Sequence, residues 1–494
     1  MSRKSDGLVV PGKRANNVLQ EAAEPVEGRG STKSNRQHDA PGLTQRRNTG
    51  TSRLLAVRQL AQRDKKQTFN NLFSLMDEGL LTESFYQLKR QSAAGCDGMT
   101  WQTYETALSE HISQLVQTLQ SGQYRPKPAR RVFIAKEDGS PRPLSIICLE
   151  EKIVQQAVVT ILNQIYETDF LGFSYGFRPG RGQHHALDAL SVAIKRNRVN
   201  WVLDLDISKF FDTIEHDWMV RFVAHRVSDK RLLRLLSQWL KVGALDEHGH
   251  RVQSHVGSPQ GAVISPLLAN IFLHYVFELW TNKYRKACRG RISVVRYADD
   301  AVVGFEVKEE AEQFVLDAAA RLAQYGLMLH PEKTKLLPFG TQVAKRGHHA
   351  KERGSSFDFL GFSHYMGRTR KGWFTVMRKT KRSRLVGQLK QIRRELKGKR
   401  LHRPVGETGA WLRSVVMGHM NYYAVPQNTQ AIGRFILEVT KAWLKALRRR
   451  SQRKRMSWSR FKGYIALWIP RARVMHPYPD ERFDGRTRGR SRMG

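Results

Sequence analysis

The chain has 494 residues, and its 84 Lys and Arg against 44 Asp and Glu give a formal net charge of +40. At about 100–200 residues per domain, this length predicts two to four domains. The large positive charge indicates a polyanionic partner and says nothing about fold.

The three cysteines, Cys96, Cys148 and Cys288, are far apart in the sequence and form no CxxC pair. Neither a cysteine-built zinc site nor a disulfide framework is therefore predicted, and a reducing, intracellular setting fits. The polar N-terminus lacks the apolar core of a signal peptide. The apolar stretch 261–280 contains Pro266 and three polar residues, Asn270, His274 and Glu278, so we expect a buried helix and no membrane partner.

In chain order, residues 1–50 are rich in Gly, Asn, Ser, Arg and Gln and poor in large apolar residues. They predict a disordered basic arm, because they bury too little apolar surface to offset the entropy of ordering. Helical spacing begins near residue 52. A loop is then expected at 93–98, a β-hairpin at 130–147 with its turn near 137–140, and a helix at 149–167.

The rest of the chain alternates between strand and helix patterns before becoming mainly helical. We expect a strand running into a turn at 201–214, a helix at 229–242, strand–turn–strand at 291–305, a helix at 308–325, β-rich pieces at 327–339 and 357–366, and helices from about 379 to 468. This order favours an α+β core followed by an α-helical module. The module is basic, since residues 366–494 hold 34 Lys and Arg against 6 Asp and Glu.

Three carboxylates lie where apolar strands end. Asp206 closes the run "WVLDLD", while Asp299 and Asp300 lie in a turn between two pairs of valines. Asp is common in turns because its side chain bonds nearby amides, but an adjacent pair in an apolar hairpin carries uncompensated charge. Mg²⁺ prefers such oxygen ligands, and two ions about 3.5–4 Å apart can serve an in-line phosphoryl displacement. We therefore expect Asp206, Asp299 and Asp300 to bind two Mg²⁺ ions.

Several blocks in order carry a family resemblance. "YADD" (297–300) and "DISKFFD" (206–212) resemble reverse transcriptase signatures. Other blocks are similar to intron-encoded enzymes: "RRVFIAKEDGSPRPLSI" from residue 130, "SYGFRPGRG" (174–182), "GSPQGAVISPLLANIFL" (257–273), "GLMLHPEKTK" (326–335), "FDFLGFSHY" (357–365) and "GHMNYYA" (418–424). Over roughly residues 70–470 the chain resembles a group II intron-encoded reverse transcriptase/maturase.

This resemblance implies a right-hand polymerase fold. Residues 51–365 would be fingers and palm, 366–470 an α-helical thumb/maturase (X) domain, and 471–494 a basic tail without an endonuclease domain. Asp206 and Asp299 would be the main metal ligands, with Asp300 supporting. The deoxynucleoside triphosphate would be contacted by four residues, Lys136, Arg142, Phe211 and Gln260. Phe211 would exclude a ribose 2′-hydroxyl, although core packing of Phe210 and Phe211 is the plainer interpretation. Lys333 matches a lysine of one downstream block.

The implied activity is an RNA-directed DNA polymerase that binds its intron RNA, assists splicing and reverse-transcribes the intron during retrohoming. Its partners would be intron RNA, target DNA with a primer 3′ end, and deoxynucleoside triphosphates. RNA contacts are expected from Arg448, Arg449, Arg450, Arg453, Lys454 and Arg455. Two alternatives stay open: a reverse transcriptase recruited to defence or CRISPR-type function, and a splicing-only maturase. A bacterial cytoplasmic location, with the nucleoid when DNA is bound, is expected, and an organelle stays open.

Overall fold

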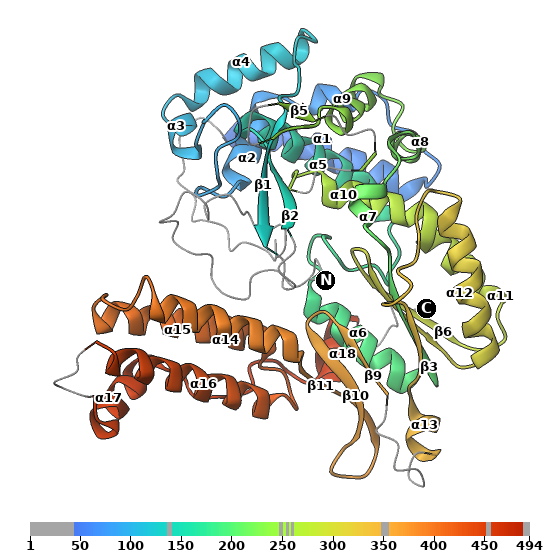
Figure 1. Cartoon of the computed structure of the whole chain (residues 1–494). Coiled ribbons are helices and arrows are strands. Elements are labelled where there is room, and N and C mark those ends of the chain that lie inside the picture. The colour runs from blue at the N-terminus through green and yellow to red at the C-terminus, as the bar shows by residue number, and fades with distance from the viewer. Residues whose placement is uncertain are drawn as a thin grey trace.

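The structure is a computed structural model that describes residues 44–135, 141–246, 250–252, 256–257, 261–346, 355–450 and 456–487. Helices and strands are mixed along the chain, which confirms the α+β class. In Figure 1 a helical layer lies at the top, a central sheet at the right and a helical bundle at the lower left.

The upper layer is built around one buried helix. Its helical elements are α1 (Thr44–Arg63), η1 (Leu72–Leu75), α2 (Glu78–Gln87), α3 (Trp101–Glu105), α4 (Leu108–Gln120), α5 (Leu149–Asp169), α8 (His216–Ala224) and α9 (Lys230–Lys241). Helix α5 packs against α1 and α2. Most of its residues are buried, because it is apolar on more than one face.

Below this layer, the two strands of the predicted hairpin are confirmed, and its predicted turn at 137–140 lies outside the described residues. Strands β1 (Ala129–Ala135) and β2 (Pro141–Ile146) pair antiparallel, with Arg130 opposite Ile146. The short strands β4 (Ala244–Leu245) and β5 (Arg251–Val252) extend the sheet in the order β2-β1-β4-β5.

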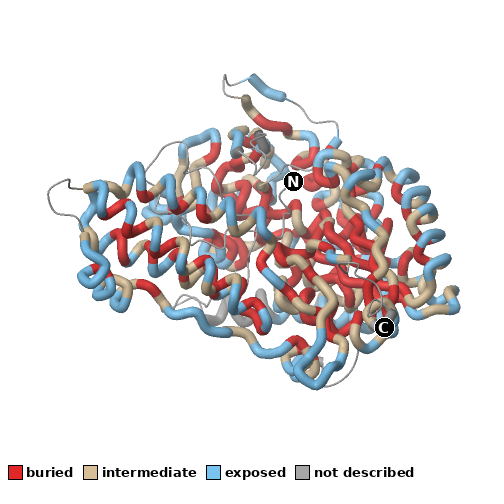
Figure 2. The backbone as a smooth tube through the Cα atoms, turned by 60° about the horizontal axis from the view of Figure 1, so that its bottom comes forward, coloured by how far each residue is buried: buried red, intermediate tan, exposed pale blue. Residues whose placement is uncertain are grey.

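The central sheet has the strand order β6-β7-β3-β8. Its strands are β6 (Ile292–Tyr297), β7 (Asp300–Phe305), β3 (Trp201–Asp206) and β8 (Lys335–Pro338). Every residue of β6 and β7 is buried, and the sheet lies between two apolar cores. Figure 2 shows the buried residues concentrated in the interior of the molecule. The predicted hairpin at 291–305 is confirmed.

Helices cover both faces of this sheet. Helix α6 (Gln183–Arg196) packs against β6 and β7 and contributes to one core. On the opposite face lie α7 (Phe210–Thr213), α10 (Ser265–Leu273), the π-helical segment η2 (His274–Glu278), α11 (Leu279–Ala287) and α12 (Lys308–Ala323). The buried helix predicted within 261–280 is confirmed by α10 and η2.

The C-terminal part begins with a three-stranded sheet of order β11-β10-β9. After α13 (Thr341–Arg346), its strands are β9 (Ser356–Phe359), β10 (Phe362–Arg368) and β11 (Phe374–Thr380). The helical region predicted from 379 to 468 is confirmed as α14 (Arg382–Lys397), α15 (Val405–Tyr423), α16 (Thr429–Arg448) and α17 (Trp458–Trp468). These four helices, the C-terminal bundle, form the lower-left lobe of Figure 1.

The two ends of the described chain differ from the sequence expectation. Helix α1 begins at Thr44 rather than near residue 52. Helix α18 (Pro479–Thr487) lies within the expected basic tail and packs against α6. Phe483 of α18 is buried, and at the surface Asp480 pairs with Lys195 and Asp484 with Arg196. Residues 1–43 lie outside the described residues, and no described helix has the length and apolar character needed to cross a membrane.

Candidate active site

The three carboxylates meet at one end of the central sheet. Asp206 is the last residue of β3, and Asp300, the first of β7, lies directly opposite it in the antiparallel register. Directly opposed side chains project from the same face, with Cβ atoms about 4.5–5.5 Å apart. Asp299 belongs to the two-residue turn that joins β6 to β7. Residues separated by more than ninety positions in sequence are thus neighbours.

A lysine accompanies the carboxylate on β3. Lys333 Nζ lies 3.3 Å from Asp206 Oδ2, and the Asp206 side chain is 15% exposed. The Asp206 carbonyl accepts a hydrogen bond from His330 N at 2.8 Å, which fixes the lysine-bearing segment beside β3. Asp300 is more deeply buried, at 4% exposed. Lys333 therefore already supplies one positive charge to this acidic strand end.

The carboxylate oxygens at this end of the sheet are suitable ligands for a divalent cation. Carboxylate oxygens are the ligands Mg²⁺ prefers, and the register brings two carboxylates face to face where their charges repel. Lys333 occupies the position of a counter-cation at Asp206. Within the described ranges, no three His, Cys, Asp or Glu side chains are already gathered around a single point.

A buried arginine holds the turn that carries Asp299. Arg296 in β6 is 1% exposed and donates from Nη1 to the carbonyl of Ala298 at 2.7 Å. Ala298 has a φ of 55°, in the left-handed region that non-glycine residues seldom occupy. The same Nη1 reaches Asn270 Oδ1 at 3.1 Å. The guanidinium of Arg296 therefore holds the unusual backbone conformation of this turn through a charge-assisted hydrogen bond.

The charge of this arginine is balanced within the core. Arg296 Nε lies 2.9 Å from Glu278 Oε1, and His274 Nδ1 lies 2.9 Å from Glu278 Oε2. Burial alone would raise the pKa of Glu278, but Arg296 and then His274 outweigh it and hold the pKa of this carboxyl well below its usual range. Glu278 and Arg296 form a fully buried ion pair directly behind the turn.

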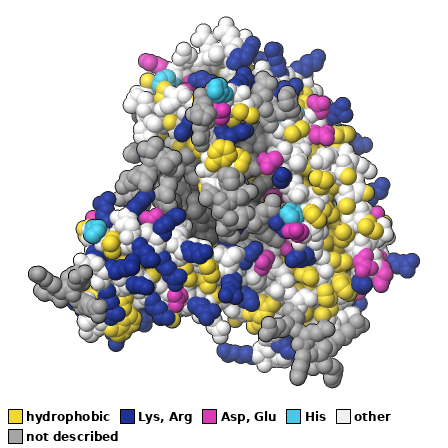
Figure 3. All heavy atoms as spheres, in the orientation of Figure 1, with side chains coloured by type: hydrophobic (Ala, Val, Ile, Leu, Met, Phe, Trp, Pro, Cys, Tyr) yellow, Lys and Arg dark blue, Asp and Glu magenta, His cyan; other side chains and the backbone are white. Residues whose placement is uncertain are grey.

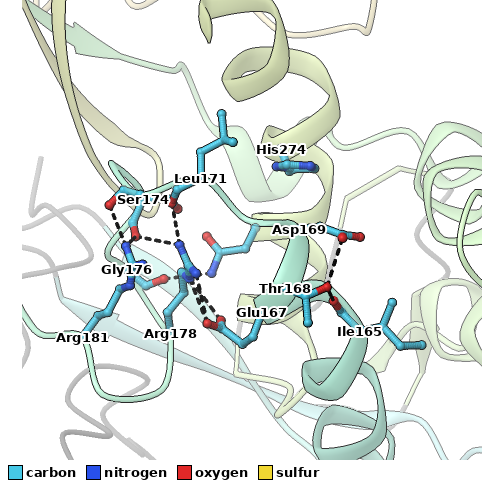
Figure 4. A network of polar contacts seen from close by, with 12 residues as sticks. Ile165, Glu167, Thr168, Asp169, Leu171, Ser174, Gly176, Arg178, Arg181 and His274 are labelled. Carbon is cyan, nitrogen blue, oxygen red and sulfur yellow. Dashed lines mark hydrogen bonds and ion pairs between the residues drawn. The ribbon is translucent and has the colours of Figure 1, made fainter. Parts of the chain in front are cut away.

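A second support for the turn that carries Asp299 comes from the loop 174–182, drawn in Figure 4. Arg178 donates to Glu167 and, at 2.8 Å, to the carbonyl of Leu171. Arg181 donates to the carbonyl of Ser174 at 2.6 Å. Two arginines thus fold the loop onto the end of α5. Ser174 Oγ, in turn, accepts from Arg296 Nη2 at 2.6 Å.

The same loop touches the turn that carries Asp299 through a glycine. A Cβ added to Gly176 would lie 2.3 Å from Ala298 N, so only glycine permits this approach. Asn270 Nδ2 holds the Gly176 carbonyl at 2.8 Å. Sequence reasoning identified the blocks that contain these residues but missed their roles. The sequence signal that could have indicated this support was Arg296, an arginine near the end of an apolar strand.

The predicted nucleotide-contacting residues are placed as follows. Phe211 is 5% exposed, lies in α7 and packs beside Phe210 with 5.3 Å between ring centroids. Both rings are buried because the strand ends at Asp206 and a helical turn replaces the expected strand alternation. Arg142 lies in β2 opposite Ile134. Lys136 and Gln260 lie outside the described residues.

The predicted RNA-contacting arginines follow the end of α16. Arg448 and Arg449 are exposed. Arg450 is half-buried, donates to the carbonyl of Arg400 at 3.2 Å, and has its pKa lowered by burial. Arg453, Lys454 and Arg455 lie outside the described residues. Figure 3 shows Lys and Arg side chains gathered over the lobe formed by the C-terminal bundle.

Comparison with known proteins identifies the region around these carboxylates. Residues 134–364 match the family described as reverse transcriptase (RNA-dependent DNA polymerase). Protein YkfC of Escherichia coli (strain K12) is 37% identical over 241 residues, which cover 42% of this chain and 62% of that protein. The group II intron-encoded protein LtrA of Lactococcus lactis subsp. cremoris is 32% identical over 226 residues, 44% of this chain and 37% of LtrA.

A further relative extends over more of the chain. The putative COX1/OXI3 intron 1 protein of Saccharomyces cerevisiae is 28% identical over 350 residues, which cover 61% of this chain and 42% of that protein. The chain thus spans between about a third and two thirds of the length of these relatives. Residues 134–364 are therefore similar to reverse transcriptases, and parts of the chain are similar to a group II intron-encoded protein and to a mitochondrial intron protein.

Proposed function

We propose that this protein is an RNA-directed DNA polymerase. The observation that carries the proposal is the register of β3 and β7, which sets Asp206 opposite Asp300 beside the turn that bears Asp299. This strand end lies inside the segment that matches the reverse transcriptase family. In this proposal the upper helical layer and the β1–β2 hairpin are fingers, the central sheet is the palm, and the C-terminal bundle is the thumb.

Each residue then has a defined task. Asp206 and Asp299 would hold two Mg²⁺ ions, with Asp300 supporting them and Lys333 exchanging its contact with Asp206. Bound Mg²⁺ would stabilise charge on the attacking and leaving oxygens during nucleotidyl transfer. Lys136, Arg142 and Gln260 would orient the incoming deoxynucleoside triphosphate. The buried Phe211 ring would limit space beside the sugar and so disfavour a 2′-hydroxyl.

The basic C-terminal bundle supports a second role as an intron maturase. Its exposed Lys and Arg can neutralise phosphates, which gives affinity with little sequence information. We propose that the protein binds its group II intron RNA, assists splicing, and copies the intron at target DNA during retrohoming in a bacterial cytoplasm. The name of LtrA, a group II intron-encoded protein, supports this proposal.

Substitution at the turn tests the polymerase. Asp299→Ala should abolish extension of a DNA primer on an RNA template with Mg²⁺, because the carboxylate cannot be replaced by methyl. Glu309→Gln, at an exposed position in the first turn of α12, is the matched control and should keep full extension. Continued extension by the Asp299 variant would refute the assignment.

A splicing assay separates the maturase from the two alternatives. An intron transcript that splices poorly at low Mg²⁺ should splice when the protein is added, and the Asp299→Ala variant should still support this. A polymerase recruited to another task would extend primers without any rescue of splicing. A splicing-only protein would rescue splicing while the unmodified chain fails to extend primers.

A further inference from the structure

Two cysteines that are distant in sequence have their sulfur atoms in contact. Cys96 Sγ lies 3.2 Å from Cys148 Sγ, although 52 positions separate them in the chain. Cys96 is exposed in the loop between α2 and α3, whereas Cys148 is buried and caps the N-terminus of α5. Cys288 follows a different helix, α11. The sequence spacing that predicted no disulfide framework therefore missed a tertiary pair.

Three basic side chains hold the Cys96 loop in place. They come from the segment before β1, from β1 itself and from α5, and all reach residues that flank Cys96. The contacts are Lys152 Nζ to Ala93 O at 3.0 Å, Arg130 Nη2 to Ala94 O at 3.1 Å, and Lys127 Nζ to Asp97 Oδ2 at 3.2 Å. The sulfur contact thus belongs to an anchored loop rather than to a free chain end.

Close backbone packing sets the separation of the sulfurs. A Cβ placed on Gly95 would lie 2.5 Å from Cys148 Cα, so the loop can press against the start of α5 only because residue 95 is glycine. A disulfide bond is about 2.05 Å long, so bonding requires the two sulfurs to approach by about a further 1 Å.

We propose that Cys96 and Cys148 form a redox modification site that closes to a disulfide on reaction with a low-molecular-weight disulfide. The Cys96 thiolate attacks one sulfur of the oxidant, breaks its S–S bond and forms a mixed disulfide. Cys148 Sγ then attacks Cys96 Sγ and displaces the second half of the oxidant. Two protein thiols are oxidised, one small disulfide is reduced to two thiols, and the two thiol protons pass to the released thiolates.

The exposure of Cys96 and the raised pKa of Cys148 determine the order of these steps. The thiolate is the reactive form, and only Cys96 is exposed to the oxidant. Burial and the contact with Cys96 raise the pKa of Cys148 to about 12, so Cys148 is inert toward oxidants in solution. It reacts once the mixed disulfide at Cys96 places a sulfur beside it.

The product would join the loop 93–98 covalently to the first turn of α5, immediately after β2. The bond closes a long loop and therefore constrains the unfolded chain, so oxidised protein should melt at a higher temperature. Intracellular disulfides of this kind are usually transient and redox-sensing, and a thiol reductant should reverse the change. The site is independent of the proposed polymerase activity.

The test uses the full chain and glutathione disulfide as the probe. After incubation, the free thiols should fall from three to one, the remaining thiol should be Cys288, and digestion should yield a peptide linked through Cys96 and Cys148. Dithiothreitol should restore all three thiols. Cys288→Ser is the matched control and should form the same linked peptide.

Two variants separate the steps. Cys148→Ser should retain a stable glutathione adduct on Cys96, and Cys96→Ser should stay unmodified at Cys148. The proposal is overturned if the unmodified chain keeps three thiols, or if its Cys96 holds glutathione without passing the bond to Cys148. Both readouts come from the unmodified chain, so they stand even if a variant fails to fold.

Discussion

At the scale of single residues, the buried ion pair between Arg296 and Glu278 supports the turn that carries Asp299. Arg296→Met should lower the free energy of unfolding by about 3–5 kcal/mol, because it leaves the Glu278 carboxylate buried beside an apolar side chain. Urea denaturation followed by circular dichroism measures this loss.

The double variant Arg296→Met/Glu278→Gln gives the control. Removing both charges together should recover part of the lost stability, since no uncompensated charge then stays buried. A double variant as unstable as the sum of the two single variants would contradict coupling between the two side chains.

The sequence predicted Asp299 and Asp300 as candidate site residues, but it did not predict the role of Arg296. Asp299 and Asp300 stand out because adjacent carboxylates in an apolar hairpin require a reason. Arg296 contacts residues from three other segments, and no local pattern reports contacts with Asn270, Ser174 and Glu278 together.

At the scale of secondary-structure elements, the C-terminal bundle contains a histidine that is buried between its helices. His419 in α15 has Nδ1 2.6 Å from Gln388 Oε1 of α14, and its ring stacks on Phe435 of α16 with 3.8 Å between centroids. Burial lowers the pKa of His419 from 6.5 to about 3. The neutral ring is therefore part of the packing between three helices.

This burial predicts acid sensitivity of the bundle. The unfolded chain binds a proton near pH 6.5 and the folded one near pH 3, so stability is full above pH 6.5 and falls as the pH drops toward 3. At pH 5 the loss should be about 2 kcal/mol. His419→Gln should reduce the difference in unfolding free energy between pH 7 and pH 5 by that amount. An unchanged difference would argue against His419 as the source.

Helix and strand patterns predicted most elements whose apolar residues form a regular pattern or a continuous run. The hairpins at 130–147 and 291–305 and the helices of the bundle were found in this way. Helix α6 was missed; its middle is buried nearly all around, which weakens the amphipathic signal. Helix α18 was missed because its composition resembles that of a charged tail.

At the scale of the whole molecule, helix α18 follows the C-terminal bundle in the sequence and packs against α6, which covers one face of the central sheet. Asp188 in α6 lies 3.3 Å from Arg378 Nη1 of β11 and also pairs with Arg482 of α18. Asp188 and Arg378 are both buried, and burial lowers the pKa of Arg378 while Asp188 opposes that shift. One carboxylate thus joins three elements that are remote in sequence.

Asp188→Asn should therefore destabilise the protein by about 3–5 kcal/mol, because two arginines lose their shared countercharge. Asp484→Asn, which alters the exposed pair with Arg196, is the matched control and should leave the thermal midpoint nearly unchanged. Equal effects of the two substitutions, measured by calorimetry, would show that burial does not govern this contact.

The charge of the whole chain predicts how nucleic-acid binding responds to salt. If 6–10 phosphates are neutralised, RNA affinity should fall by about 10³–10⁵ between roughly 50 and 200 mM salt, because counterions are released on binding. Filter binding across this range measures the slope. A flat response would contradict phosphate contacts by the basic bundle.

The sequence by itself determined the α+β class, the two hairpins, the basic character of the segment 366–494 and the three carboxylates worth testing. These follow from local periodicity and charge, which neighbouring residues carry. Only the tertiary structure decided that Lys333 pairs with Asp206, that Arg296 holds the turn, that α18 docks on α6 and that Cys96 meets Cys148. Each of these contacts joins segments brought together by burial of a shared core, and sequence spacing does not encode such distances.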